Sequence, residues 1–160
     1  MTIKRLYHGS PEKIEDGKIR VRPGHINGMK TEITAVFATS DLANARLYAA
    51  MRFIGTGWKF PRDSGKLFVE KLQPSISGKA YIYELDNDGF ERDGPIDYYS
   101  LEDKKIKDVI EIDIMNEIKN GNIKVYILDV DTSNMTSKES LPLCEKAMKE
   151  GSFKLYNPDA

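Results

Sequence analysis

ITAVFATSDLANARLYAAMRF, residues 33–53, predicts a strand that leads directly into a helix. Residues 33–39 are rich in apolar and β-branched residues, as is typical of strands. Ser40 or Asp41 can cap the helix that follows, because a side-chain oxygen there accepts a free N–H of the first turn. We predict this helix from Asp41 to about Phe53, with Tyr48 on the shoulder of its apolar face. That face consists of residues at helical spacing: Leu42, Ala45, Ala49 and Phe53.

Short strands bounded by turn residues make up most of the remaining chain. Alternating apolar and polar residues, or brief aromatic and β-branched runs ended by Gly, Pro, Asn or Asp, are typical of such strands. They are predicted at residues 3–8, 18–22, 66–72, 78–86, 90–92, 97–101, 109–112 and 123–130, with further helices at 114–119 and 138–150. Many short strands and few helices indicate an α+β domain whose sheet is mostly antiparallel.

The length of 160 residues is enough for one domain with its own hydrophobic core. No internal repeat, low-complexity tract or long linker divides the sequence. We therefore expect a single domain over residues 1–150, followed by a C-terminal tail at residues 151–160.

Composition and charge exclude several classes of function. Lys and Arg number 24 and Asp and Glu 25, so the formal net charge of −1 offers no bulk attraction to nucleic acid or to an anionic membrane. One cysteine, Cys144, and two histidines, His8 and His25, cannot build a cysteine or multi-histidine metal site, and we expect no metal. No long apolar run and no signal peptide is visible, which favours a cytoplasmic protein without membrane contact.

The first candidate site is Tyr7-His8-Gly9-Ser10, at the end of the first predicted strand. An imidazole here stands beside bare backbone, and Gly9 lets a flat ligand approach the main chain because no Cβ blocks it. The structural alternative is a surface histidine before a Gly-Ser-Pro turn.

The second candidate combines aromatic residues at the junction of the strand and the helix. Phe37 and Tyr48 could enclose a planar ring between two aromatic faces, and a cationic ring would gain additional attraction there. Ordinary core packing is the alternative for both residues.

The third candidate is Asp97, which opens the aromatic run Asp97-Tyr98-Tyr99-Ser100. An acid at this place can stabilise positive charge or accept a hydrogen bond from a ligand hydroxyl. The alternative is a solvated acid after a turn, and Glu102 and Asp103 are close rivals for the same role.

These three segments, in this order, resemble the ADP-ribosyltransferase-like superfamily, and more closely its poly(ADP-ribose) polymerase-type branch with a His–Tyr–Glu triad. In that branch a strand ends in His-Gly-Ser or His-Gly-Thr, a second strand carries Tyr-Phe-Ala, a helix brings a tyrosine and a late strand brings a glutamate. Here His8-Gly9-Ser10, Val36-Phe37-Ala38, Tyr48 and Asp97 occupy the corresponding places, with Val36 in place of the first aromatic. The resemblance extends from about Ile3 to Ile112 in three short segments.

The resemblance implies a split β-sandwich fold and transfer of ADP-ribose from NAD⁺, used as co-substrate, through an oxocarbenium-like transition state. It implies that His8 binds a ribose hydroxyl and that Tyr48 stacks on nicotinamide. It also implies that Asp97 holds the ribose 2′-hydroxyl and faces the developing cation. Four further residues would bind NAD⁺ beside them: Gly9 through its backbone, Ser10 at the adenosine ribose, and Phe37 and Ala38 behind the ring.

Two other functions remain open at this stage. Aspartate is one methylene shorter than glutamate, and a displacement near 1 Å can cost ~10²-fold in rate, so Asp97 also fits a degenerate domain that binds a nucleotide or a partner without turnover. RNA 2′-phosphotransferases share the fold and are the second alternative. The acceptor, whether protein, nucleic acid or small molecule, would be selected by loops 24–30 and 55–65, and the oligomeric state is open.

Overall fold

The computed structural model describes residues 4–25, 32–56, 65–69, 71–128, 142–143, 146–147, 149–150 and 153–159. It is a mixed α+β fold with mostly antiparallel strands, as expected. The helices are α1 (Leu42–Ile54) and α2 (Ile114–Lys119). The strands are β1 (Leu6–Ser10), β2 (Lys18–Ile19), β3 (Arg22–Gly24), β4 (Ile33–Thr39), β5 (Gly55–Thr56), β6 (Lys66–Val69), β7 (Lys71–Leu72), β8 (Lys79–Leu85), β9 (Glu91–Arg92), β10 (Asp97–Ser100), β11 (Lys104–Asp113), β12 (Lys124–Leu128) and β13 (Phe153–Leu155).

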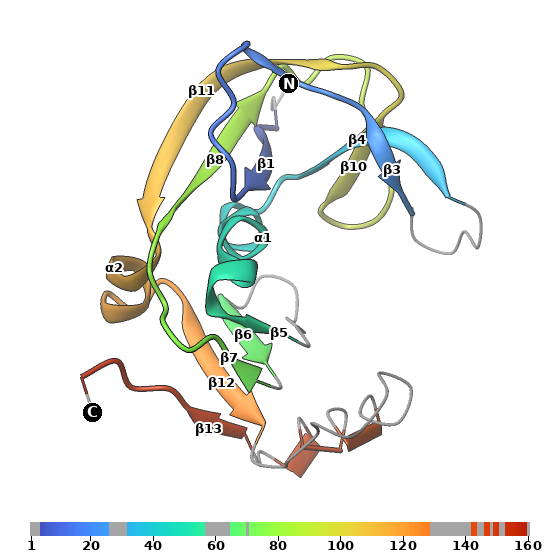
Figure 1. The fold of residues 1–160 in the computed structure, drawn as a ribbon. Coiled ribbons are helices and arrows are strands. Elements are labelled where there is room, and N and C mark those ends of the chain that lie inside the picture. Colours follow the sequence, from blue (N-terminus) through green and yellow to red (C-terminus); the bar gives the residue numbers. More distant parts are fainter. Residues whose placement is uncertain are drawn as a thin grey trace.

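The strands form one large sheet and two small ones. The large sheet has the order β2-β11-β8-β1-β4-β10-β9, with β3 also paired to β4. A smaller sheet has the order β13-β12-β6, in which β12 and β6 run parallel, and β5 pairs with β7. Figure 1 shows α1 between the large sheet above and the small sheets below.

The large sheet divides between its central strands β1 and β4. These two strands share a single paired position, Tyr7 opposite Thr39, whereas β1 pairs with β8 along its whole length. In Figure 1, β4, β3 and β10 turn away from β1, β8 and β11 beyond this point. On the far side of β4, Asp97 in β10 also pairs with Thr39, so Tyr7, Thr39 and Asp97 form one row across three strands.

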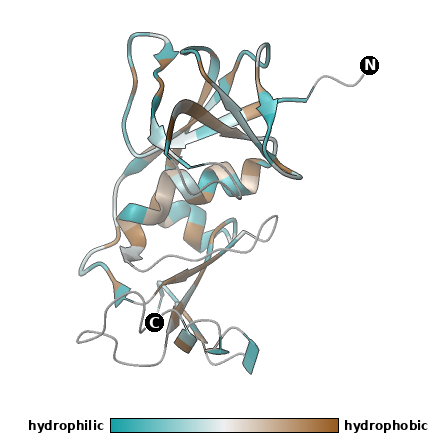
Figure 2. Cartoon of the chain, turned by 90° about the vertical axis from the view of Figure 1, so that its right-hand side faces the viewer, coloured by the Kyte–Doolittle hydropathy of each residue, from teal (hydrophilic) through white to brown (hydrophobic). Residues whose placement is uncertain are grey.

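Helix α1 forms where its cap and its apolar face predict it. The side chain of Asp41 accepts the N–H of Asn44 at 3.0 Å, as an N-cap does. The helix buries more residues than a single stripe, because strands cover it from more than one side; the buried apolar residues are Ala45, Leu47, Ala49, Ala50 and Ile54. Figure 2 shows apolar residues along this helix and along the strands next to it.

Two apolar cores lie on opposite faces of the large sheet. The first joins α1 to β8, β6 and β12 and includes Ile82, Leu67 and Val125. The second includes Leu6, Val36, Ala38, Tyr83 and Leu85. Side chains alternate between the two faces of a strand. In β4, Val36 therefore packs in the second core, whereas the next residue, Phe37, lines a pocket on the other face.

Several strands differ from their predicted bounds. Strand β1 continues through Gly9 and Ser10 instead of ending at His8, because it pairs with β8 as far as Ser10. The segments predicted at 18–22 and 66–72 are each divided into two strands, and β3 includes Pro23 and Gly24. Strand β11 begins at Lys104 rather than at Val109. Part of the expected C-terminal tail is strand β13, which pairs antiparallel with β12.

The predicted bounds of β4 and α2 are confirmed. Most of loop 55–65 and of the helix expected at 138–150 lies outside the described residues. Among the residues that are described, no helix is long and apolar enough to cross a membrane.

Removing the Asp41 cap is expected to destabilise the fold moderately. Asp41→Ala should lower the free energy of unfolding by about 1 kcal/mol, because the Asn44 N–H loses its side-chain acceptor at the start of a packed helix. Urea unfolding followed by circular dichroism measures this change. The variant Asp41→Asn, which retains an acceptor, should remain close to wild type, and equal losses in both variants would contradict the capping role.

Candidate functional site

A pocket of about 310 Å³ opens where β1 and β4 separate. It brings together residues from both halves of the divided sheet and from the helix between the sheets. Its lining residues are Tyr7, His8, Gly9, His25, Phe37, Ala38, Thr39, Tyr48, Asp93, Asp97 and Tyr98. Three residues proposed from the sequence as a triad, His8, Tyr48 and Asp97, thus share one cavity despite their separation along the chain.

His8 is held across the gap between the two halves of the sheet. Its Nδ1 lies 2.7 Å from the backbone oxygen of Phe37, and since a carbonyl only accepts, Nδ1 carries the hydrogen and donates it. Burial lowers the pKa of the imidazole below its usual value, outweighing the raising effect of this hydrogen bond, and the Arg22 guanidinium lowers the pKa further. His8 is therefore neutral near pH 7, with Nε2 as the ring's acceptor.

Gly9 allows helix α1 to lie directly on β1. A Cβ at this position would stand 2.1 Å from the backbone oxygen of Ala45 and 2.8 Å from the backbone nitrogen of Ala49. The absence of a side chain is thus required by the packing of the helix, in addition to exposing backbone to the pocket that Gly9 lines. The same close approach brings Tyr48, one residue before Ala49, to the pocket.

Aromatic rings line the pocket from four elements, and Tyr7 is the one that β1 contributes. The Phe37 ring lies over Gly24, where an added Cβ would be 2.5 Å from it. Tyr48 projects from α1 and is 46% exposed, so it lines the pocket and is not part of the core. Tyr98 lines the pocket from β10, and its hydroxyl accepts a hydrogen bond from Lys4 Nζ at 2.8 Å.

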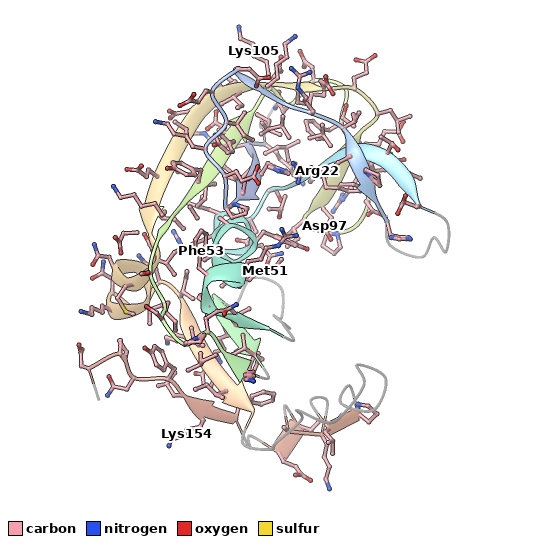
Figure 3. All side chains as sticks on the ribbon, viewed as in Figure 1. Arg22, Met51, Phe53, Asp97, Lys105 and Lys154 are labelled. Carbon is pink, nitrogen blue, oxygen red and sulfur yellow. The ribbon has the colours of Figure 1, made fainter. Side chains whose placement is uncertain are left out.

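Asp97 lines the pocket, whereas its rivals Glu102 and Asp103 do not. Glu102 is exposed and lines a separate hollow with Glu91 and Tyr99. Asp93 joins Asp97 at the pocket, because the turn between β9 and β10 folds back so that the Asp93 N–H donates to the backbone oxygen of Asp97 at 2.8 Å. Figure 3 labels Asp97 and Arg22 on the open side of the large sheet, near α1.

Ser10 is the one proposed binding residue that does not line the pocket. It is buried, and its hydroxyl accepts the N–H of Glu12 at 3.1 Å, which stabilises the turn after β1. Val36, which stands where the resembling family has an aromatic, is buried in the second core and does not line the pocket either.

Sequence reasoning assigned no role to five of the lining residues, although Tyr7 and Tyr98 stand within the first and third candidate segments. The five are Tyr7, His25, Thr39, Asp93 and Tyr98. His25 follows β3 directly, and its place in the loop we associated with acceptor choice was the only available signal. Asp93 stands four residues before Asp97 in an Asp-Gly-Pro turn, which could have suggested a second carboxylate near the first.

Stability is expected to fall as the pH drops below about 6.5, because the His8 imidazole resists protonation in the folded chain but not in the unfolded one. The unfolded chain then binds more protons, so the free energy of unfolding rises with pH through this window. Urea unfolding across this pH range should give a smaller slope for His8→Asn, whose amide can still donate to Phe37. An unchanged slope would contradict a buried neutral imidazole.

No group of three or more His, Cys, Asp or Glu side chains able to hold a metal ion occurs in the part of the chain that the structure describes. Comparison of the chain with protein-family models, curated proteins and solved structures finds no match.

Proposed function

We propose that this protein binds NAD⁺ in the pocket between β1 and β4 and cleaves the bond between nicotinamide and ribose, transferring ADP-ribose to an acceptor or to water. The proposal includes an ADP-ribosyltransferase-like fold, which the division of the large sheet at β1 and β4 supports. The observation that carries it is the meeting of His8, Tyr48 and Asp97 in one pocket of about 310 Å³. A pocket of this size lies at the lower end of the range of small-molecule sites.

His8 would orient the ribose. With Nδ1–H committed to Phe37, only Nε2 can meet a ligand, and in the neutral ring this nitrogen accepts a hydrogen bond. A ribose hydroxyl is a suitable donor. Because the imidazole is fixed between two strands, it holds the ribose without reorganisation during the reaction.

The leaving ring would lie between aromatic surfaces. The Tyr48 ring is exposed at the pocket and the Phe37 ring is held over Gly24, so each can offer a face to a planar group. Nicotinamide in NAD⁺ is cationic, and the aromatic faces and pocket carboxylates both attract positive charge. The exposed Gly9 backbone is suited to hydrogen-bond the ring's amide.

Asp97 would stabilise the transition state. When the glycosidic bond breaks, its electron pair goes to the nicotinamide nitrogen, which becomes neutral, and positive charge develops on the ribose ring. A carboxylate facing that ring stabilises the charge where it forms. The acceptor or a water then attacks the anomeric carbon and releases its proton to solvent. Asp93 adds a second negative charge at the same pocket.

Val36 does not weigh against turnover. Its side chain packs with Leu6, Ala38 and Tyr83 in the second core, so an aromatic residue at this position would not reach the pocket. The shorter acid Asp97 is a second difference from the resembling family, and it bears directly on the chemistry. The shorter side chain favours slow transfer of ADP-ribose. If the carboxylate does not reach the ribose at all, the domain binds nucleotide without turnover.

The experiment that tests the function is release of free nicotinamide from NAD⁺ by the purified protein, measured by liquid chromatography. We expect release that is saturable in NAD⁺ and that His8→Asn lowers strongly, because the amide keeps the bond to Phe37 but lacks Nε2. Glu102→Gln is the matched control, since it alters an exposed acid outside the pocket.

The other outcomes assign the alternatives. Saturable NAD⁺ binding without release would indicate a degenerate binding domain. Loss of the 2′-phosphate from RNA, in a protein that releases no nicotinamide from NAD⁺ alone, would indicate the phosphotransferase reaction. Release that His8→Asn leaves unchanged would contradict the proposed site.

A further inference from the structure

Strand β11 has an outer edge that is open along most of its length. One edge of β11 pairs with β8 from Ile106 to Asp113, with a bulge at Lys107, which has no partner in β8. On the other edge, β2 pairs only with Lys104 and Lys105, and the Ile106 N–H donates to Gly17 at 2.9 Å. Within the described residues, no strand pairs with this outer edge over residues 107–113. Figure 1 shows β11 at the border of the large sheet.

The open stretch carries apolar side chains that solvent reaches. Val109 is 49% exposed and Ile110 is 42% exposed, although both are strong strand formers. The Asp108 carboxylate accepts the N–H of its neighbour Val109 at 2.9 Å, so the chain satisfies this donor locally. An edge strand of this length, with β-branched residues at its centre, is a template for pairing with another strand.

We propose that a second copy of this chain pairs with β11 in antiparallel register, with the two-fold axis at Ile110. Seven residues, 107–113, are open, and Ile110 is their midpoint. In this register Ile110 meets Ile110 of the second copy, and Lys107 lies opposite Asp113 of the second copy. Val109 lies opposite Glu111 of the second copy, and each such pair occurs twice by symmetry.

The charges of the strand favour a second copy over an unrelated strand. The sequence KKIKDVIEID, residues 104–113, is basic in its first half and acidic in its second. An antiparallel copy places the basic half beside the acidic half, whereas a parallel copy would place like charges together. Lys107 is exposed, and its Nζ makes a long contact of 3.9 Å with Oε2 of Glu84. Asp113 accepts the Asn116 N–H through Oδ1, so its Oδ2 can accept a hydrogen bond from the lysine of the second copy.

Sedimentation velocity of the full chain, from low to high micromolar concentration, tests the proposal. A contact of this size is at the lower limit of specific interfaces, so we expect a monomer–dimer equilibrium that shifts within this range. Ile110→Lys places two like charges at the axis, and Lys107→Glu opposes Asp113 of the second copy. Each should weaken association at least about tenfold. Lys105→Glu is the matched control. Lys105 pairs with Lys18 of β2 and lies outside the open stretch, so this variant should leave association unchanged.

Hydrogen exchange of the unaltered chain gives a second measurement that depends on no variant. Amides in residues 107–113 should exchange more slowly as protein concentration rises, while those of β9, the opposite border of the sheet, should not change. A monomer at every concentration overturns the proposal. A dimer that neither Ile110→Lys nor Lys107→Glu weakens, in variants that fold normally by circular dichroism, overturns it equally.

Discussion

Asp97→Asn is expected to lower nicotinamide release from NAD⁺ by about 10²-fold or more, with little effect on NAD⁺ binding. The amide has nearly the same shape as the carboxylate but cannot stabilise positive charge on the ribose ring. The loss should therefore appear mainly in kcat and less in KM, because the carboxylate meets positive charge on the ribose ring only in the transition state. Steady-state kinetics of released nicotinamide measure both parameters.

Two further variants control this result. Asp97→Glu keeps the charge and changes only its reach, so it should retain more activity than Asp97→Asn. Glu102→Gln removes a carboxylate from outside the pocket and should leave kcat at the wild-type value. If Asp97→Asn turned over NAD⁺ as fast as wild type, Asp97 would have no part in the chemistry.

Gly9→Ala is expected to be the most destabilising single-methyl change at the site. The added Cβ would stand 2.1 Å from the Ala45 backbone oxygen and 2.8 Å from the Ala49 backbone nitrogen, so the helix itself must move. Inserting a methyl group into a filled space costs about 1–3 kcal/mol, and more where backbone must shift. We expect a loss near the upper end of that range, measured by urea unfolding.

Gly17→Ala is the matched control for this loss. Gly17 has a positive φ of 79°, but an added Cβ would meet no atom within 4 Å, so only backbone strain contributes. That strain costs about 1–2 kcal/mol. A loss in Gly9→Ala no larger than in Gly17→Ala would mean that α1 does not depend on the close approach to β1.

Local signals predict α1 and β4 well. The Asp41 cap and the helical spacing of apolar residues mark the helix, and both lie within a few residues of the positions they determine. They underestimate the width of its buried face, since Leu47, Ala50 and Ile54 are buried as well. Spacing within one helix gives no information about the number of sheets that cover it.

Pairing between distant strands accounts for most of what the sequence does not predict. Gly9 and Ser10 carry turn signals, yet pairing with β8 keeps them in β1. The first half of β11 is rich in lysine, so the sequence lacks the apolar alternation that would predict a strand there. Strand β13 has three residues, and its partner β12 is remote in sequence.

The candidate site shows the same division. His8, Phe37, Tyr48 and Asp97 could be selected by residue type and resemblance, and all four line the pocket. Asp93 was not proposed, because its place beside Asp97 depends on the fold of the turn before β10, which the Asp-Gly-Pro sequence only suggests. Ser10 does not line the pocket as predicted, because its hydroxyl accepts a hydrogen bond in the turn after β1.

A crystal structure of the Asp97→Asn protein with NAD⁺ tests the shared pocket most directly, because slow turnover keeps the ligand intact. The account predicts the nicotinamide riboside between Tyr48 and Phe37, with a ribose hydroxyl donating to His8 Nε2 and another beside position 97. NAD⁺ bound elsewhere, or a pocket still empty at saturating NAD⁺, would contradict it.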